Sequence, residues 1–321
     1  MTDHSPHCQS YPPLMLASNL AHTYSIVACD TTSGEMGVAV QSHWFSVGSV
    51  VSWAEAGVGA IATQALVNAS FGARGLELLK QGKTAPEVVD ILTVADESRD
   101  VRQVAVVDST GGIAAHTGQT CIPEAGHMVG KSFSVQANMM LSNGVWPAMA
   151  KAFEASTGPL AERMIAALEA AQNAGGDIRG RQSAAILVVR TESTGKIWED
   201  RLIDLRVEDH PEPVSELRRL LSVFRAYEYM NEGDVAMEKA DLAGALKAYG
   251  AAQLLCPDNI EMRYWHAISL VNMGMTEEAL PIFREVFTAE GNWLILTDRL
   301  SVVGMLKANE DDLGRIRSLI N

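Results

Sequence analysis

The residue with the clearest potential for catalysis is Thr23, which stands at the start of the first predicted strand, TYSIVAC. A threonine hydroxyl is a weak nucleophile and needs a base beside it. Cleavage of the chain between His22 and Thr23 would free an α-amine with a pKa of about 7.7–8.0, which could accept the hydroxyl proton. In the uncut chain the same nitrogen is an amide without useful basicity. Cleavage would therefore activate a nucleophile, although threonine is also a favourable residue at any strand start.

Polar side chains close three other predicted strands. Asn138 follows the run FSVQ, where its NH2 group could donate to a developing oxyanion; losing such a donor typically costs ~2.7–4 kcal/mol, although asparagine also suits a simple turn. Ser42 and His43 end the second strand and could reach the start of the first, or could lie in a solvated loop. Gln64 and Asn68 close another strand, where a buried amide could orient a substrate or tie the loop down.

Motifs for several other kinds of site are absent from the sequence. It contains no GxSxG elbow, no Walker loop, no GxGxxG after a strand and no HExxH. Its eight histidines never fall at i, i+4 on a plausible helix, so we expect neither a metal site nor a cofactor. A serine or cysteine hydrolase is a further alternative, with Ser42 or Cys121 as nucleophile and His43 or His127 as base.

The order of hydrophobic patterns predicts the elements that position these residues. Short apolar runs, including GSVVSWA from Gly48, predict consecutive strands. After them the patterns predict two helices, further strands, two more helices, and finally the strands SAAILVVR and WEDRLIDLRV. Strands joined by short turns favour antiparallel pairing over parallel βαβ winding, the competing arrangement. We therefore expect an α+β domain over residues 23–209, built as a four-layer αββα sandwich of two sheets covered by helix pairs.

The rest of the chain reads as helical. Residues 210–216, with two prolines, predict a linker, and residues 217–321 a helical domain. Ala226–Asn259 and Ile260–Trp293 are each 34 residues long, the period of a tetratricopeptide repeat. Small and aromatic residues fall where such repeats need them: Gly233, Ala245, Tyr249, Ala252 and Pro257 in the first, and Ala267, Gly274, Ala279 and Phe283 in the second. An uncommitted pair of helical hairpins is the alternative.

Several long segments of the first domain resemble a known family. These are HTYSIVACDTTSGEMGVAVQS, GVGAIATQALVN, VRQVAVVD, HTGQTCIPEAGH, FSVQAN and GGDIRGRQSAAILVV. Together they are similar to the Ntn-hydrolase-like domain-of-unknown-function family 1028, over about residues 22–207. The resemblance implies the αββα Ntn sandwich and hydrolysis of an amide-type bond. Members commonly begin Met-Thr-Phe-Ser, so that removal of Met exposes the Thr, and Thr23 takes that place here.

The resemblance also implies roles for the residues before the strand SAAILVV. By analogy with Ntn sites, Asp177 and Ser183 would tune the α-amine, and Arg181 with Gln182 would bind substrate, Arg181 by a bidentate contact to a carboxylate. The alternative is an internal salt bridge from Asp177 to Arg179 or Arg181.

One departure from the family pattern bears on activity. Twenty-two residues precede Thr23, so removal of the first Met does not expose it. Autoproteolysis could remove residues 1–22, the true start codon could lie downstream of the assigned one, or the protein could be a non-catalytic relative. Residues 1–22 lack the charged start and unbroken apolar run of a secretory signal, so we interpret them as an extension or pro-segment.

Composition limits the classes of partner. Lys and Arg total 25 against 39 Asp and Glu, a net charge of −14, so no basic surface for nucleic acid or for a membrane is expected. The apolar stretches are far shorter than the ~20 residues that cross a bilayer. Four cysteines without CxxC spacing predict neither a disulfide framework nor a zinc knuckle, and favour a cytoplasmic protein.

Two functions fit these observations. The first is an N-terminal-nucleophile hydrolase that cleaves an amide C–N bond of a small molecule or peptide through Thr23 after removal of residues 1–22. The second is a non-catalytic binding or scaffold protein of the same fold, which recruits a protein partner through its helical repeats. A homo-oligomer is compatible with either.

Overall fold

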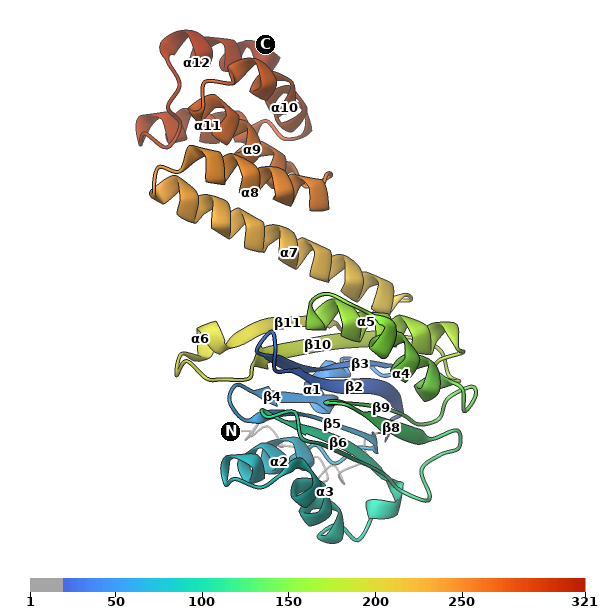
Figure 1. Cartoon of the computed structure of the whole chain (residues 1–321). Helices are drawn as coiled ribbons and strands as arrows, with labels where there is room; N and C mark the ends of the chain where they lie inside the picture. The colour runs from blue at the N-terminus through green and yellow to red at the C-terminus, as the bar shows by residue number, and fades with distance from the viewer. Residues whose placement is uncertain (1–19, 321) are drawn as a thin grey trace, which may run out of the picture. The chain divides into compact units, whose positions relative to one another are not determined.

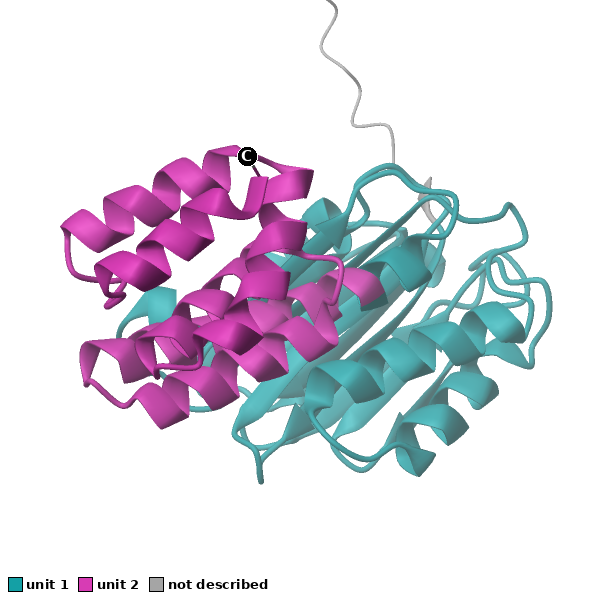
Figure 2. Cartoon of the chain, turned by 90° about the horizontal axis from the view of Figure 1, so that it is seen from above, with its two compact units in different colours: residues 1–218 teal, residues 219–321 magenta. Residues whose placement is uncertain are grey.

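The structure is a computed structural model that describes residues 20–320 of the chain (Figure 1). It contains two compact units that divide between Arg218 and Arg219, coloured teal and magenta in Figure 2. The first unit holds both β-sheets, and the second is helical. Of the expected pro-segment, residues 1–19 lie outside the described part of the chain.

The larger sheet has six strands, and every neighbouring pair in it is antiparallel. At its centre Thr23 lies opposite Ser42, which in turn lies opposite Ser183. In spatial order the strands are β11 (Arg201–Val207), β10 (Ser183–Arg190), β3 (Glu35–Ser42), β2 (Thr23–Asp30), β9 (Phe133–Ala137) and β8 (Gly126–Gly130).

The smaller sheet has five strands, which are also paired antiparallel. One path runs through β1 (Leu20–Ala21), β5 (Gly59–Leu66), β6 (Arg102–Asp108) and β7 (Ile113–Thr117), and β4 (Ser52–Glu55) also pairs with β5. The 3-10 turn η1 (Arg99–Val101) leads into β6.

The two sheets lie face to face between two pairs of helices. α2 (Ser70–Lys80) and α3 (Ala85–Val94) contact the smaller sheet, whereas α4 (Val145–Ala155) and α5 (Leu160–Asn173) contact the larger one (Figure 1). Strands β2 and β3 of one sheet contact β5 of the other. The expected α+β class with antiparallel sheets is confirmed, and the parallel βαβ alternative is wrong.

Two segments predicted as strands begin instead as short helices. Residues 48–51 of GSVVSWA form α1 (Gly48–Val51), and only the rest becomes β4. A Cβ at Gly48 would lie 2.5 Å from the Cβ of Ala185, so α1 packs directly on β10. Similarly, α6 (Ile197–Asp200) precedes β11 because the Asp200 carboxylate accepts hydrogen bonds from Thr194 N at 2.8 Å and Ser193 Oγ at 2.7 Å, which close a local turn.

The helical part starts earlier than the sequence suggested. α7 (Pro213–Glu238) begins inside the expected linker of residues 210–216, because proline is compatible with the first position of a helix. The chain continues through α8 (Leu242–Leu255), α9 (Ile260–Asn272), α10 (Thr276–Ala289), α11 (Asn292–Val302), α12 (Glu310–Arg317) and the 3-10 turn η2 (Ser318–Ile320). Among the helices of residues 20–320, none combines the length and apolar character needed to span a membrane.

The packing of the second unit uses the small and aromatic residues noted in the sequence. A Cβ at Gly233 would lie 2.4 Å from the Tyr249 ring, so glycine allows α7 and α8 to approach closely. Ala267, Ala279 and Phe283 belong to one buried cluster shared by α9 and α10. Close contacts between these helices therefore depend on the predicted positions.

The space between the two sheets has an apolar half and a polar half. Val27, Val38 and Ala60 belong to the apolar half, together with inward-facing residues of β6 and β10. The other half is lined by fully buried polar residues: Thr23, Ser25, Ser42, Gln64, Gln103, Ser134, Gln136 and Asn138. Buried polar groups are costly unless they are hydrogen-bonded. Their concentration at one end of the sandwich therefore marks a candidate site.

Candidate active site

The chain passes from one sheet to the other at His22. β1 ends at Ala21 in the smaller sheet, and β2 begins at Thr23 in the larger one, so His22 is the single residue between them. The His22 side chain is 1% exposed, and Thr23 is fully buried. The peptide bond between His22 and Thr23 is therefore held inside the polar end of the sandwich.

The carbonyl oxygen of His22 accepts two strong hydrogen bonds. One comes from Ser42 Oγ at 2.6 Å and the other from Arg179 Nη2 at 2.7 Å. Sheet register supplies Ser42, because it lies directly opposite Thr23. Donors placed in this way stabilise the negative charge that forms on a carbonyl oxygen when a nucleophile attacks its carbon.

Arg179 is oriented by a carboxylate. Its Nε donates to Asp177 Oδ1 at 3.0 Å and its Nη2 to Asp177 Oδ2 at 2.7 Å, a fork that fixes the guanidinium plane. The same carboxylate accepts from the backbone N–H of His43 at 3.2 Å. Asp177 thus acts on the His22 carbonyl through Arg179. The internal salt bridge considered as an alternative role for Asp177 is present, and its partner is Arg179.

The backbone of Thr23 is also held from both sheets. Its carbonyl oxygen accepts from Asn138 N at 3.1 Å, from Gln64 Nε2 at 3.2 Å and from Asn138 Nδ2 at 3.4 Å. Gln64 comes from β5 of the smaller sheet, whereas Asn138 directly follows β9 of the larger one. These contacts limit the movement of Thr23 relative to the His22 carbonyl.

The imidazole of His22 lies against the side chain of Asn138. His22 Nδ1 is 2.8 Å from Asn138 Oδ1, and a proton on Nδ1 satisfies both atoms. Burial lowers the pKa of His22, and the positive charge of Arg179 lowers it further against the opposing hydrogen bond to Asn138. The ring is therefore neutral near pH 7. Its Nε2 is buried and has no hydrogen-bond partner among the described residues.

A chain of buried amides fixes the orientation of Asn138. Asn138 Nδ2 donates to Gln103 Oε1 at 2.9 Å, and Gln64 Nε2 donates to the same oxygen at 2.6 Å. Gln103 Nε2 donates in turn to Thr117 Oγ1 at 2.8 Å, and Thr117 Oγ1 is 2.8 Å from His127 Nδ1. Because the Asn138 nitrogen is engaged by Gln103, its oxygen faces His22.

Two residues beside this network have strained backbones. Ala65, next to Gln64, has φ +70°, and Met139, next to Asn138, has φ +58°. Non-glycine residues in this region cost about 1–3 kcal/mol each and persist where the surrounding structure holds them, often at functional sites. Both outliers lie next to side chains that hold Thr23.

The structure brings some of the predicted residues together and separates others. Thr23, Ser42, Gln64 and Asn138 form one hydrogen-bonded group around His22, which Asp177 joins through Arg179. Asn138 was expected as the oxyanion donor. The donors to the His22 carbonyl are instead Ser42 and Arg179.

The other predicted residues hold neighbouring loops. Ser183 Oγ donates to the Trp44 carbonyl and accepts from Val47 N, and Asn68 accepts from Ser70 and contacts Asp96. His43 is exposed, with Nδ1 3.3 Å from the Arg181 carbonyl, and the Gln182 backbone N–H donates to the Ser42 carbonyl. The exposed side chain of Arg181 is paired with Glu212.

The arrangement does not support the serine or cysteine alternative. His127 is bonded to Thr117, whereas the Cys121 thiol contacts the Arg102 carbonyl at 3.4 Å, and burial raises the pKa of that thiol. The Ser42 hydroxyl donates to the His22 carbonyl, not to His43. Within residues 20–320, no three His, Cys, Asp or Glu side chains gather in a way that could hold a metal ion.

The sequence predicted no site role for the side chains of three residues: His22, Arg179 and Gln103. Gln103 offered a signal, because it shares the inward-facing parity of Ala105 and Val107 in an otherwise apolar strand. Arg179 offered none beyond its nearness to Asp177, since its contact with His22 joins residues far apart in the chain.

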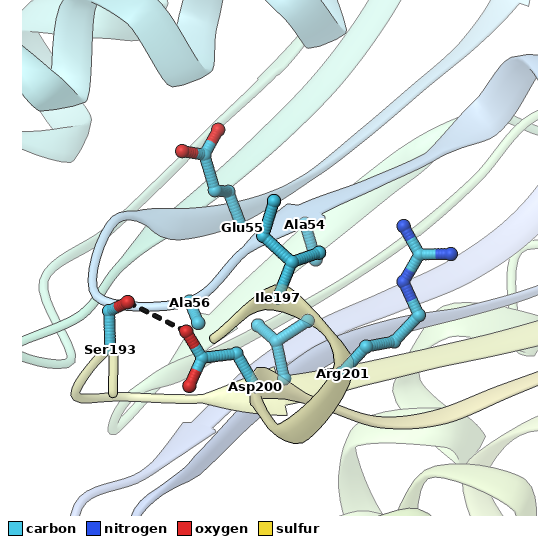
Figure 3. Close-up of a pocket in the computed structure, with 8 residues that line it drawn as sticks. Ala54, Glu55, Ala56, Ser193, Ile197, Asp200 and Arg201 are labelled. Atoms are coloured by element: carbon cyan, nitrogen blue, oxygen red, sulfur yellow. Dashed lines mark hydrogen bonds between the residues drawn. The ribbon is translucent and has the colours of Figure 1, made fainter. Parts of the chain in front are cut away.

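A cavity of about 350 Å³ lies at the end of the sandwich opposite Thr23 (Figure 3). It is lined by Ala54, Glu55, Ala56, Val189, Ser193, Ile197, Asp200 and Arg201. The Asp200 carboxylate in it is engaged by Ser193 and Thr194, and these hydrogen bonds lower its pKa. Its contacts are those of a side chain that closes a local loop.

Comparisons with known proteins place the first unit in a family. A family model described as a family of unknown function (DUF1028) matches residues 23–217. The crystal structure of protein SPO2555 from Silicibacter pomeroyi, which carries the same family label, is similar at 32% sequence identity and a TM-score of 0.57, covering 63% of this chain and 88% of that one. No curated protein matches the chain. The chain therefore belongs to the family of unknown function DUF1028.

Proposed function

We propose that this protein is an N-terminal-nucleophile hydrolase that cleaves its own His22–Thr23 bond and then hydrolyses amide bonds with the exposed Thr23. The observation that carries the proposal is the carbonyl of His22, the residue bonded to Thr23, whose oxygen accepts from Ser42 and Arg179. These are the donors that an attack on that carbonyl requires. Two antiparallel sheets between pairs of helices, the arrangement that the resemblance to Ntn hydrolases implies, support the proposal.

The first reaction is cleavage of the chain. Thr23 Oγ attacks the His22 carbonyl carbon, and the oxyanion is stabilised by Ser42 and Arg179. The C–N bond breaks, the Thr23 nitrogen takes the hydroxyl proton, and an ester joins His22 to Thr23 Oγ. Water then hydrolyses this ester, which releases the His22 carboxylate and leaves Thr23 with a free α-amine.

The second reaction repeats the same chemistry on a substrate. The α-amine, with a pKa of about 7.7–8.0, removes the hydroxyl proton and later returns it to the leaving amine. An acyl ester forms on Thr23 Oγ, and water releases the acid. The family match supports this reading because it begins at Thr23, the residue that would become the first of the mature protein.

The experiment is the intact mass of freshly purified full-length protein and of its Thr23→Ala variant. We expect the wild-type chain to lose residues 1–22 and the variant to keep them, while Thr23→Ser still cleaves. A chain started with Met directly before Thr23 provides the second arm, in which host removal of Met exposes Thr23. If neither form gives Thr23-dependent cleavage or amide hydrolysis, the proposal is wrong.

A second candidate function is recruitment of a protein partner by tetratricopeptide-like repeats of the second unit. The observation in its favour is a cavity of about 570 Å³ lined by apolar residues such as Trp265, Ile268 and Met305, with Asp234 and Glu238 at its side. This function would survive the Thr23→Ala substitution, whereas the hydrolase would not.

A further inference from the structure

The segment before Thr23 is held at three places, and each contact limits which substrates the proposed hydrolase could bind. Leu20 and Ala21 pair with β5 in antiparallel register. The His22 carbonyl accepts from Ser42 and Arg179, and the His22 ring contacts Asn138. The inference that follows rests on the proposed function.

Self-cleavage and turnover would use the same hydroxyl and the same two donors. Ser42 and Arg179 stay in place when residues 1–22 leave, because one belongs to β3 and the other is fixed by Asp177. A substrate carbonyl oxygen must therefore lie where the His22 oxygen lies. The acyl side of that substrate must extend into the space that His22 and β1 vacate.

The space vacated by the imidazole requires a hydrogen-bond donor. Asn138 Oδ1 accepts from the ring at 2.8 Å, and the amide cannot turn without losing the contact of its nitrogen with Gln103 at 2.9 Å. Gln103 is itself held by Thr117 and by the Ala137 carbonyl at 3.0 Å. An apolar group in this space would leave a buried acceptor unpaired, which is unfavourable.

The charges around this space favour a neutral group. Arg179 and Asp177 face it as an ion pair, and the desolvation that disfavours the charged form of His22 applies to any occupant. A cation would also be repelled by Arg179, and an anion would face the Asn138 oxygen. The Nε2 atom of the imidazole has no partner among the described residues, so the N–H group is what the space recognises. A carboxamide side chain is neutral and also offers an N–H donor, and it therefore suits the space as well.

Loss of β1 would open a strand edge. Leu20 and Ala21 are paired with Leu66 and Ala65 at one end of β5. When they leave, the backbone groups of these two β5 residues become available to another extended chain, a mode by which sheets bind peptides.

We infer that the mature enzyme hydrolyses peptidyl amides in which the residue before the scissile bond carries a neutral hydrogen-bond donor, with histidine as the first choice. The two preceding residues add to β5 as a short antiparallel strand. The bond broken is the substrate C–N bond, the bond formed is the ester to Thr23 Oγ, and water releases the peptide acid while the leaving amine takes the proton.

The test uses the self-cleaved protein and chromogenic amides that differ at one position. Acetyl-Leu-Ala-His-p-nitroanilide is compared with its Leu and Lys counterparts at the third residue, and with acetyl-His-p-nitroanilide. We expect kcat/KM for the His tripeptide to exceed each of the others by about 10-fold or more. The Leu peptide lacks the hydrogen-bond donor, the Lys peptide carries a charge that Arg179 repels, and acetyl-His-p-nitroanilide lacks the two residues that pair with β5. Asn138→Leu should remove the preference for His over Leu.

A binding measurement on unmodified protein avoids reliance on the variant. Acetyl-Leu-Ala-His with a free carboxylate resembles the released end of the pro-segment and should bind at least about 10-fold more tightly than acetyl-Leu-Ala-Leu by calorimetry. Thr23-dependent hydrolysis with equal rates for His and Leu, or equal binding of the two acids, would overturn the inference and leave the proposed function intact. Loss of all Thr23-dependent hydrolysis would instead overturn the proposed function.

Discussion

The two ends of the sandwich use polar residues in different ways. At the end near Asp200, the carboxylates that close turns bond to residues close in sequence: Asp108 Oδ1 accepts from Gly112 N at 2.9 Å, and Asp200 Oδ1 from Thr194 N at 2.8 Å, while Asp30 also pairs with the distant Arg163. At the end near Thr23, partners come from distant segments, as Arg179 does for the His22 carbonyl. Local pairing closes a turn, whereas distant pairing assembles a site that exists only when both sheets are in place.

Non-glycine residues with positive φ occur at both ends. Ala65 and Met139, both with positive φ, lie beside the side chains that hold Thr23. Most turns at the opposite end place glycines such as Gly34, Gly57 and Gly111 at positive φ, where the conformation is inexpensive, and Ser132 with φ +59° is an exception there. The two ends therefore differ in what the strained residues adjoin: Ser132 lies in the turn between β8 and β9, whereas Ala65 and Met139 adjoin the side chains that hold Thr23. The following substitutions test this contrast.

The largest effect after loss of Thr23 itself should come from Ser42→Ala. It removes one donor to the His22 carbonyl, and the rate of self-cleavage should fall by about 10²–10³-fold. The rate is measured by intact mass over time in purified protein. The matched control is Ser193→Ala, which removes a hydroxyl from the opposite end and should leave cleavage unchanged. Equal effects of the two would erase the distinction between the ends.

A smaller effect should follow from Arg179→Lys. Lysine keeps the positive charge but lacks the fork that binds Asp177 and the His22 carbonyl together, so cleavage should slow by about 10–100-fold. Arg181→Lys, at an exposed arginine two residues away, is the control. If Arg181→Lys slows self-cleavage more than Arg179→Lys does, then Arg181, not Arg179, has the role proposed here.

Gln103→Leu should affect stability in the uncut Thr23→Ala chain. Its loss leaves the amides of Gln64 and Asn138 without their shared acceptor, so the free energy of unfolding should fall by about 1–3 kcal/mol. Urea unfolding measures this change. The exposed Gln81→Leu serves as a control and should change stability by less than about 0.5 kcal/mol. A Gln103→Leu chain as stable as its parent would show that the buried amides are not coupled.

The smallest effect concerns pH. Because burial lowers the pKa of His22 in the folded chain below its ordinary 6.5, the unfolded chain binds the proton more readily. The stability that His22 contributes is therefore complete above pH ~6.5 and is lost as pH falls below it. The melting temperature of the Thr23→Ala chain should drop more between pH ~7.5 and ~5.5 than that of Thr23→Ala with His22→Gln. Parallel curves for the two chains would contradict a buried neutral imidazole.

Much of the framework was predictable because its signals are local. Short apolar runs predicted β2, β3 and β10, and short turns predicted antiparallel pairing. Polar residues at strand ends directed attention to Ser42, Gln64 and Asn138, which the structure brings into one hydrogen-bonded group. The helix of residues 48–51 was missed because GSVV has strand propensity, and packing of Gly48 against Ala185 overrides it.

What the sequence by itself determined is the start of a strand at Thr23 and the polar residues at the ends of its neighbours, since both depend on residue type and spacing along one segment. Only the tertiary structure decided that the His22 carbonyl lies between Ser42 and Arg179, and that Asn138 turns its oxygen toward the His22 ring. The reason is physical: these contacts depend on strand register, on a crossing between two sheets and on amides that fix one another, none of which is encoded in neighbouring residues.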